Sequence, residues 1–187
     1  MTIYVISDIH FNHDKDFIYE SRGFHSIEEH DITIVDRINS VVQEDDELYI
    51  LGDVCMGAVD KSIDKFKLIN CRNIHIILGN HDSDAKIEIL NSLENVIEVC
   101  AAKYLKDKKW TFYLSHFPTM TCNHDDDEKS PRNHLWNLSG HTHNKNIFEN
   151  FKYGVINCSV DSLGYPYSID AIKKLIVARC EAERKPF

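Results

Sequence analysis

Short apolar runs alternate with apolar residues at helical spacing through the first half of the chain. β-Branched runs predict strands over residues 2–7, 47–51 and 73–79, and each run is followed by glycine or polar residues. Apolar residues spaced as on one helix face predict helices over residues 27–43 and 61–69. This β–α–β–α–β order predicts a largely parallel sheet that is flanked by helices.

The second half of the chain has a different pattern. A short helix is predicted near residues 84–92. Strands over 96–105 and 110–116 are predicted to follow it as an antiparallel hairpin around a polar turn. After them we expect a loop over 117–135 and strands near 136–139 and 153–158. Ser26, with Glu29 three residues later, has the spacing of a capping box, and Ser168 is the expected N-cap of a final helix. No internal repeat or linker interrupts the pattern, so we expect a single domain over residues 1–187.

Composition and charge narrow the class of protein. The apolar fraction of 43% and the charged fraction of 27% are ordinary for a globular domain. The net charge of −9 argues against a general affinity for nucleic acid backbones. No apolar run is long enough to cross a membrane, the start has no signal-peptide pattern, and the six cysteines form no Cys-x-x-Cys pair. We therefore expect a cytoplasmic protein without membrane contact or a stable nucleic acid complex; its oligomeric state stays open.

Polar side chains gather just after the predicted strands. The residues that share this location are Asp8, His10, Asp53, Asn80, His81, Asp82, His116, His141 and His143. Ligands of open α/β sheets bind outside the carboxyl ends of the strands. In an extended segment, residues i and i+2 point to the same side, so Asp8 with His10, and His141 with His143, can each aim two ligands into one space.

The chemistry of these side chains favours a metal site. Any one of the clusters alone is more typical of a turn or a solvated loop, but five clusters in one chain favour a shared site. Carboxylate, amide and imidazole donors without thiolate suit manganese, iron(II) or zinc. Glycines at positions 52, 79 and 140 fit backbone turns that bring such side chains together without Cβ clashes.

Taken in order, these motifs resemble the full signature of the calcineurin-like metallophosphoesterases. The motifs are Asp8-x-His10, Gly52-Asp53, Gly79-Asn80-His81-Asp82, His116 and Gly140-His141-x-His143. The stretches "SDIHFNHDKDFI" and "NCSVDSLGYPYSIDAI" are similar to small single-domain bacterial and phage members of that family. The resemblance implies an α/β fold, a four-layer α/β/β/α sandwich with two mixed β-sheets.

The resemblance also implies a site for two divalent metal ions. One ion would take Asp8, His10, Asp53 and His143, and the other would take Asp53, Asn80, His116 and His141. Asp53 and a hydroxide would bridge the two ions. We expect Mn²⁺, with Fe²⁺, Zn²⁺, Ni²⁺ or Co²⁺ as alternatives. Two such ions outweigh the two aspartates and one hydroxide by about one positive charge, which would attract a phosphate ester.

The expected reaction is hydrolysis of a phosphate ester by direct attack of the bridging hydroxide. By resemblance, His81 would stabilise the transition state and protonate the leaving oxygen, and Asp82 would orient the His81 ring. Asn80 and His13 are candidates for binding the substrate phosphate, and Arg22 is a candidate phosphate clamp.

Three substrate classes and one non-enzymatic function stay open. We expect a phosphodiesterase acting on a small molecule or short nucleotide, and we rank a phosphomonoesterase second. We do not expect a dedicated DNA-repair nuclease, because a chain this short has no room for the extra domain of such an enzyme. Met56 stands where a purple acid phosphatase would have a tyrosine ligand, which argues against that chemistry. A catalytically silent protein-interaction module on the same fold is the alternative from another class, and missing ligands would favour it; here each motif position is filled.

Overall fold

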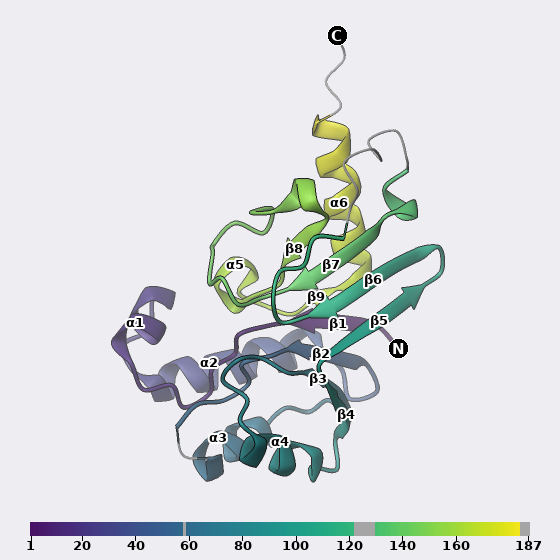
Figure 1. Cartoon of the computed structure of the whole chain (residues 1–187). Helices are drawn as coiled ribbons and strands as arrows, with labels where there is room; N and C mark the ends of the chain where they lie inside the picture. The colour runs from purple at the N-terminus through teal and green to yellow at the C-terminus, as the bar shows by residue number, and fades with distance from the viewer. Residues whose placement is uncertain (58, 122–129, 184–187) are drawn as a thin grey trace.

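Two mixed β-sheets form the centre of the fold (Figure 1). The computed structural model describes residues 1–57, 59–121 and 130–183. The first sheet has the strand order β4-β3-β2-β1-β9, with β1 (Ile3–Ile6), β2 (Glu47–Leu51), β3 (Asn73–Ile77), β4 (Val96–Cys100) and β9 (Tyr167–Ser168). Its first four strands are parallel, and β9 runs antiparallel to β1.

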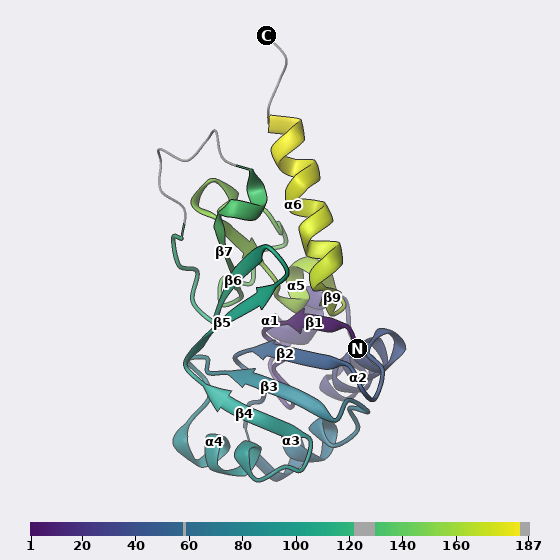
Figure 2. The ribbon, with the colours of Figure 1, turned by 90° about the vertical axis from the view of Figure 1, so that its right-hand side faces the viewer.

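The second sheet has the strand order β5-β6-β7-β8 and lies beside the first (Figure 2). Its strands are β5 (Ala102–Asp107), β6 (Trp110–Ser115), β7 (Leu135–Ser139) and β8 (Val155–Asn157). β5 and β6 pair antiparallel, whereas β6, β7 and β8 are parallel. Both sheets are therefore mixed.

Helices cover the sheets on the outside. The longer ones are α2 (Ile27–Val41), α3 (Val59–Phe66), α4 (Asp84–Asn91) and α6 (Ile169–Glu183), and the short ones are α1 (Asp16–Tyr19), α5 (Val160–Leu163) and the 3₁₀ turns η1 (Glu20–Arg22), η2 (Pro131–Asn133) and η3 (Phe151–Tyr153). The predicted caps are present: the Ser26 hydroxyl accepts the Glu29 N–H, and the Ser168 hydroxyl accepts the Ala171 N–H. In the part of the chain that the structure describes, no helix is long and apolar enough to cross a membrane.

Alternating side chains of the parallel strands pack into two different hydrophobic clusters, one on each face of the first sheet. In β2, Leu48 and Ile50 join the cluster beneath α2, α3 and α4, whereas Tyr49 and Leu51 face the second sheet. Strands that are buried on both faces in this way are typical of parallel sheets covered on both sides. Helix α6 packs along the second sheet and adds to the second cluster (Figure 2). This is the α/β fold with two mixed sheets and flanking helices that the resemblance implied.

The segment 96–105 differs from its prediction as one long strand. It forms β4 and β5, two strands that belong to different sheets, with exposed Ala101 between them. β4 continues the parallel sheet beside β3, and only β5 makes the predicted antiparallel hairpin with β6. The chain thus passes directly from the edge strand of the first sheet, β4, into the edge strand of the second sheet, β5. Within the predicted loop 117–135, residues 122–129 lie outside the described residues, and the described part contains the 3₁₀ turn η2 and the first residue of β7.

Candidate metal centre

The strand-end side chains that the sequence singled out converge around the carboxylate of Asp53. Asp53 Oδ2 lies 3.7 Å from His10 Nε2, 3.5 Å from His116 Nε2 and 3.9 Å from His81 Nε2. The carboxylate itself is only 2% exposed. One oxygen of Asp53 therefore faces imidazole nitrogens from three different strand ends, which is the position a shared ligand would occupy.

One side of Asp53 carries the first candidate ligand group. His10 Nε2 lies 3.2 Å from His143 Nε2, and Asp8 Oδ1 lies 3.7 Å from the same His143 atom. The ligand atoms of Asp8, His10 and His143 all lie within 4.8 Å of one another. Each of these three side chains can thus reach one ion.

The other side of Asp53 carries the second group. Asn80 Oδ1 lies 3.0 Å from His116 Nε2 and 2.9 Å from His141 Nδ1. The two histidines of the "HTH" stretch are therefore divided, His143 toward His10 and His141 toward His116. This division is the one that the resemblance implied for two neighbouring ions.

The environment of these donors fits two divalent cations. His116 Nδ1 donates to the Leu51 carbonyl at 2.8 Å, and His143 Nδ1 lies 2.8 Å from Asp161 Oδ2. A hydrogen bond at Nδ1 leaves Nε2 of each ring with a free lone pair aimed at the centre. Asp8 is fully buried, and burial raises the pKa of its carboxyl, so the structure places this carboxylate where a cation would stabilise it.

The backbone at the site departs from the extended geometry expected from the sequence. Asp8, His10, Asp53, His141 and His143 all have positive φ, between 52° and 73°. The expectation that i and i+2 side chains point together because the segment is extended was therefore wrong. Asp8 Oδ1 does lie 4.0 Å from His10 Nε2, but His141 and His143 turn to different neighbours. Left-handed backbone costs energy in residues with a Cβ, and such strain concentrates at functional sites. Here the left-handed backbone lets the candidate ligands at these strand ends turn toward the site.

Glycines allow the strand-end loops to approach closely, as predicted. A Cβ on Gly79 would lie 2.2 Å from Asp53 Oδ1, and one on Gly140 would lie 2.0 Å from Asp8 Oδ2. Gly52 has φ +90°, and a Cβ there would lie 2.6 Å from His116 Nδ1. Any larger residue at positions 79 or 140 would displace a candidate ligand.

His81 lies at the open side of the site, where a substrate could reach it. Its backbone N–H donates to Asp53 Oδ1 at 2.9 Å, and its side chain is 41% exposed. Asp82 does not hold the His81 ring, which corrects the expectation from the resemblance. The Asp82 carboxylate accepts the backbone N–H groups of Asp53, Val54 and Gly79, because it is turned into the protein. Asp82 therefore positions the loop that carries Asp53.

The two other predicted substrate contacts differ in their placement. The His13 ring is 5.2 Å from the His10 ring and 6.4 Å from the His81 ring, at the edge of the site. Arg22 does not have the exposure expected of a phosphate clamp: its side chain is 4% exposed, and each of its five N–H groups has a partner within the protein. The partners are both oxygens of Asp161, His30 Nε2 and the carbonyls of Asp8 and Ile9.

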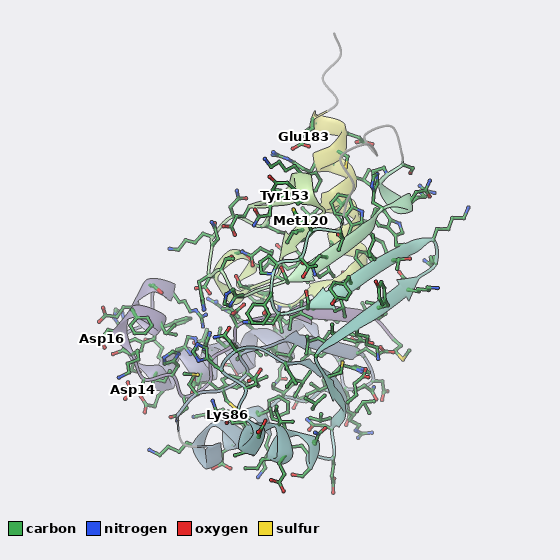
Figure 3. The ribbon with its side chains drawn as sticks, in the orientation of Figure 1. Asp14, Asp16, Lys86, Met120, Tyr153 and Glu183 are labelled. Carbon is green, nitrogen blue, oxygen red and sulfur yellow. The ribbon has the colours of Figure 1, made fainter. Side chains whose placement is uncertain are left out.

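Two residues that the sequence did not single out support the site. Asp161 joins His143 to Arg22; burial alone would raise the pKa of Asp161, but hydrogen bonds from these two partners hold it below its usual value. Lys86, on α4 (Figure 3), is buried and donates to the carbonyls of Cys55 and His81. Neither lies in a cluster of metal-ligating residues, so the sequence offers no local signal for them.

The calcineurin-like phosphoesterase superfamily domain matches the chain over residues 1–159. The chain belongs to this superfamily. The uncharacterized protein MJ1445 of Methanocaldococcus jannaschii is 33% identical over 183 residues, which cover 93% of this chain and 90% of that protein. The gene 66 protein of Mycobacterium phage L5 is 28% identical over 195 residues, 91% of each chain.

A solved structure agrees with the fold over nearly the whole chain. The crystal structure of the protein of unknown function AQ665 from Aquifex aeolicus matches with a TM-score of 0.70 and 26% identity, over 94% of this chain and 99% of that chain. Membership of the calcineurin-like phosphoesterases, together with the Asp and His groups that could hold an ion, supports metal-dependent hydrolysis of phosphate esters. The relatives do not define the substrate.

Asp161→Asn is expected to weaken metal binding about 10- to 100-fold, because outer partners of metal-binding histidines orient the ring and increase its basicity. The change keeps the side-chain shape but removes the charge next to His143. Competition with a chromogenic chelator measures the dissociation constants. Asp170→Asn, at a side chain 68% exposed on α6, is the matched control. Equal metal affinity in both variants would show that Asp161 does not tune His143.

Proposed function

We propose that this protein is a metal-dependent phosphodiesterase that acts on a small molecule or a short nucleotide. The observation that carries the proposal is the convergence on Asp53 Oδ2, with imidazole nitrogens of His10, His116 and His81 at 3.5–3.9 Å. When bound, two divalent cations would supply Lewis acidity to the phosphoryl group and to the attacking water. All seven positions of the expected ligand set are filled, which favours an enzyme over a silent interaction module.

The residues of the chain have separate tasks in this proposal. Asp53 holds the two ligand groups together, and the His81 N–H bond to its Oδ1 positions the ring of His81 next to them. Because that ring is exposed at the site, it can donate a proton to the leaving oxygen of a bound ester. His13, close to His10 and His81, would contact a non-bridging phosphate oxygen.

The charges next to the site favour a diester over a monoester. Arg22 and Lys86 are the buried cationic side chains held against the ligand loops, and both are engaged with carbonyl groups or with Asp161. A monoester carries two negative charges at neutral pH, whereas a diester carries one. Among the described residues, the groups that surround Asp53 Oδ2 are imidazoles, and such a site is better matched to the single charge of a diester than a site with guanidinium or ammonium groups there would be.

The test compares bis(p-nitrophenyl) phosphate with p-nitrophenyl phosphate, using protein loaded with manganese, nickel, zinc or magnesium. We expect a higher kcat/KM for the diester, loss of turnover in EDTA and recovery on adding the metal. His81→Ala should slow an alkyl ester much more than a p-nitrophenyl ester, because the nitrophenolate leaves without a proton donor. Protein with two bound metals per chain and no turnover of either ester would contradict the proposal. A higher kcat/KM for the monoester would favour a phosphomonoesterase.

A further inference from the structure

Two exposed phenylalanine rings stand next to the candidate metal centre. Phe17, on α1, is 69% exposed, and its ring is 5.7 Å from the ring of His13. Phe117 is 50% exposed, and its ring is 5.1 Å from His116 and 4.8 Å from His141. Single exposed apolar residues are common on protein surfaces. Two exposed phenylalanine side chains next to one site are less common, and their exposure calls for an explanation.

The two rings lie at opposite ends of the row of ligands. From Phe17 the row passes through His13 to His10, whose Nε2 lies 3.7 Å from Asp53 Oδ2. From the other side of Asp53 it passes through His116 to Phe117. A phosphoryl group held at Asp53 would therefore have Phe17 on the side of His10 and Phe117 on the side of His116.

Packing does not account for either ring. Neither phenylalanine belongs to the two hydrophobic clusters formed by the described residues, and their ring contacts are edge-on to histidines of the site. Because Phe17 and Phe117 are largely exposed, part of each phenyl ring stays accessible to a second planar group. Aromatic platforms of this kind bind nucleobases and aryl groups by stacking, with little dependence on which base is present.

The surroundings of α1 favour a substrate with few phosphates. Asp14, Asp16 and Glu20 are exposed around Phe17 and outnumber Lys15, as the labelled Asp14 and Asp16 show at the edge of the molecule (Figure 3). The whole chain carries a net charge of −9. Such a rim would repel the next phosphates of a long nucleic acid strand, but it would tolerate a base or an aryl ring.

We propose that Phe17 and Phe117 determine specificity by stacking on the two organic groups of a diester, one ring on each side of the phosphorus. The substrate class is then a diester with a planar aromatic group on each side and a single phosphate, of which a dinucleoside monophosphate is the simplest nucleotide. This inference rests on the proposed phosphodiesterase function and adds the substrate class to it.

The experiment uses Phe17→Leu and Phe117→Leu, which keep apolar bulk but remove the flat ring. Each variant should raise the KM for bis(p-nitrophenyl) phosphate at least about fivefold. Methyl p-nitrophenyl phosphate has a ring only on its leaving group, so just one of the two variants should raise its KM. Phe17→Trp and Phe117→Trp, which keep a flat ring, should have KM values as low as that of the wild type. Tyr104→Leu, an exposed ring that contacts Tyr113, is the matched control and should change neither KM.

Two further measurements separate stacking from damage to the site. Inhibition by inorganic phosphate, which has no organic group, should be equal in all variants, as should the number of bound metals. Calorimetry with a dinucleoside phosphorothioate, a slowly hydrolysed analogue, should show Kd values at least about fivefold weaker in each Phe→Leu variant, whether or not turnover is observed.

The outcomes distinguish this inference from the function on which it rests. Wild-type protein that hydrolyses no ester but binds the phosphorothioate through both rings would overturn the proposed function alone. Active protein whose KM and Kd values are unchanged in both Phe→Leu variants would overturn the stacking inference and leave the phosphodiesterase. Loss of phosphate inhibition or of metal in the same variants would also overturn it, because the rings would then support His13 and His116 rather than bind substrate.

Discussion

Replacing Asp53 with asparagine is expected to lower kcat/KM at least about 10³-fold and to leave fewer than two metal ions per chain. Loss of an outer partner of a metal ligand already costs about 10- to 100-fold, and Asp53 would be a ligand shared by both ions. Asparagine can still accept the His81 N–H at the Oδ1 position. At the Oδ2 position it presents either an amide oxygen without charge or an NH₂ group, which cannot ligate a cation.

Unfolding experiments on the same variant separate loss of metal from loss of fold. A ligand that binds the folded state stabilises it by about 2.7 kcal/mol when it is present at 100 times its Kd. Wild-type protein should therefore gain Tm on addition of manganese, and Asp53→Asn should gain much less. The metal-free proteins should have similar Tm values, since the change removes a buried charge rather than adding one. Asp64→Asn, at a side chain 78% exposed on α3, is the matched control.

A metal-dependent Tm gain in Asp53→Asn equal to that of the wild type would contradict the assignment of Asp53 as a shared ligand. A lower Tm in the metal-free variant would instead show that the charge of the Asp53 carboxylate stabilises the fold itself, because the acceptor for the His81 N–H is kept in the variant. The two results lead to different explanations of a loss of activity, so both states need to be measured.

Most of the elements could be predicted because burial imposes a period on the sequence. β2 is buried along almost its whole length, so its continuous apolar run marks a covered parallel strand. The segment 96–105 shows the limit of this argument. Both of its strands are apolar enough to be strands, but the pattern carries no information about which sheet each one joins. That choice depends on pairing with β3 in one case and with β6 in the other.

In the candidate site, too, some residues could be predicted from the sequence and others could not. Its candidate ligands could be predicted because each follows an apolar strand and the strand ends share one edge of the fold. Their partners could not, because Arg22 and Asp161 are 139 positions apart and Lys86 contacts the loops of two other elements from α4. The stretch "ESRGF" around Arg22 carries no geometry, so the sequence offers this arginine only as a candidate phosphate clamp. Asp161 becomes its carboxylate partner only in the folded chain.

Arg22→Leu is expected to lower the free energy of unfolding by roughly 3–5 kcal/mol, the cost of leaving a buried charge without its partner. Asp161, 7% exposed, would keep only His143, and the carbonyls of Asp8 and Ile9 would lose their donors. Urea unfolding of metal-free protein measures the effect. Arg179→Leu, whose partner Glu183 is exposed, is the matched control and should cost no more than about 1 kcal/mol.

Two additional variants decide between a positioning role and a substrate role for Arg22. Arg22→Lys keeps the charge but offers one ammonium group where five N–H groups are bound, so it should lose a large part of the stability. Arg22→Leu combined with Asp161→Leu should recover part of the loss, because no buried charge is then left unpaired. A phosphate clamp would show the opposite behaviour: normal stability in Arg22→Lys, a raised KM, and no recovery in the double variant. Because Arg22 binds the backbone carbonyls of the loop that carries Asp8 and His10, its effect on activity should follow its effect on stability.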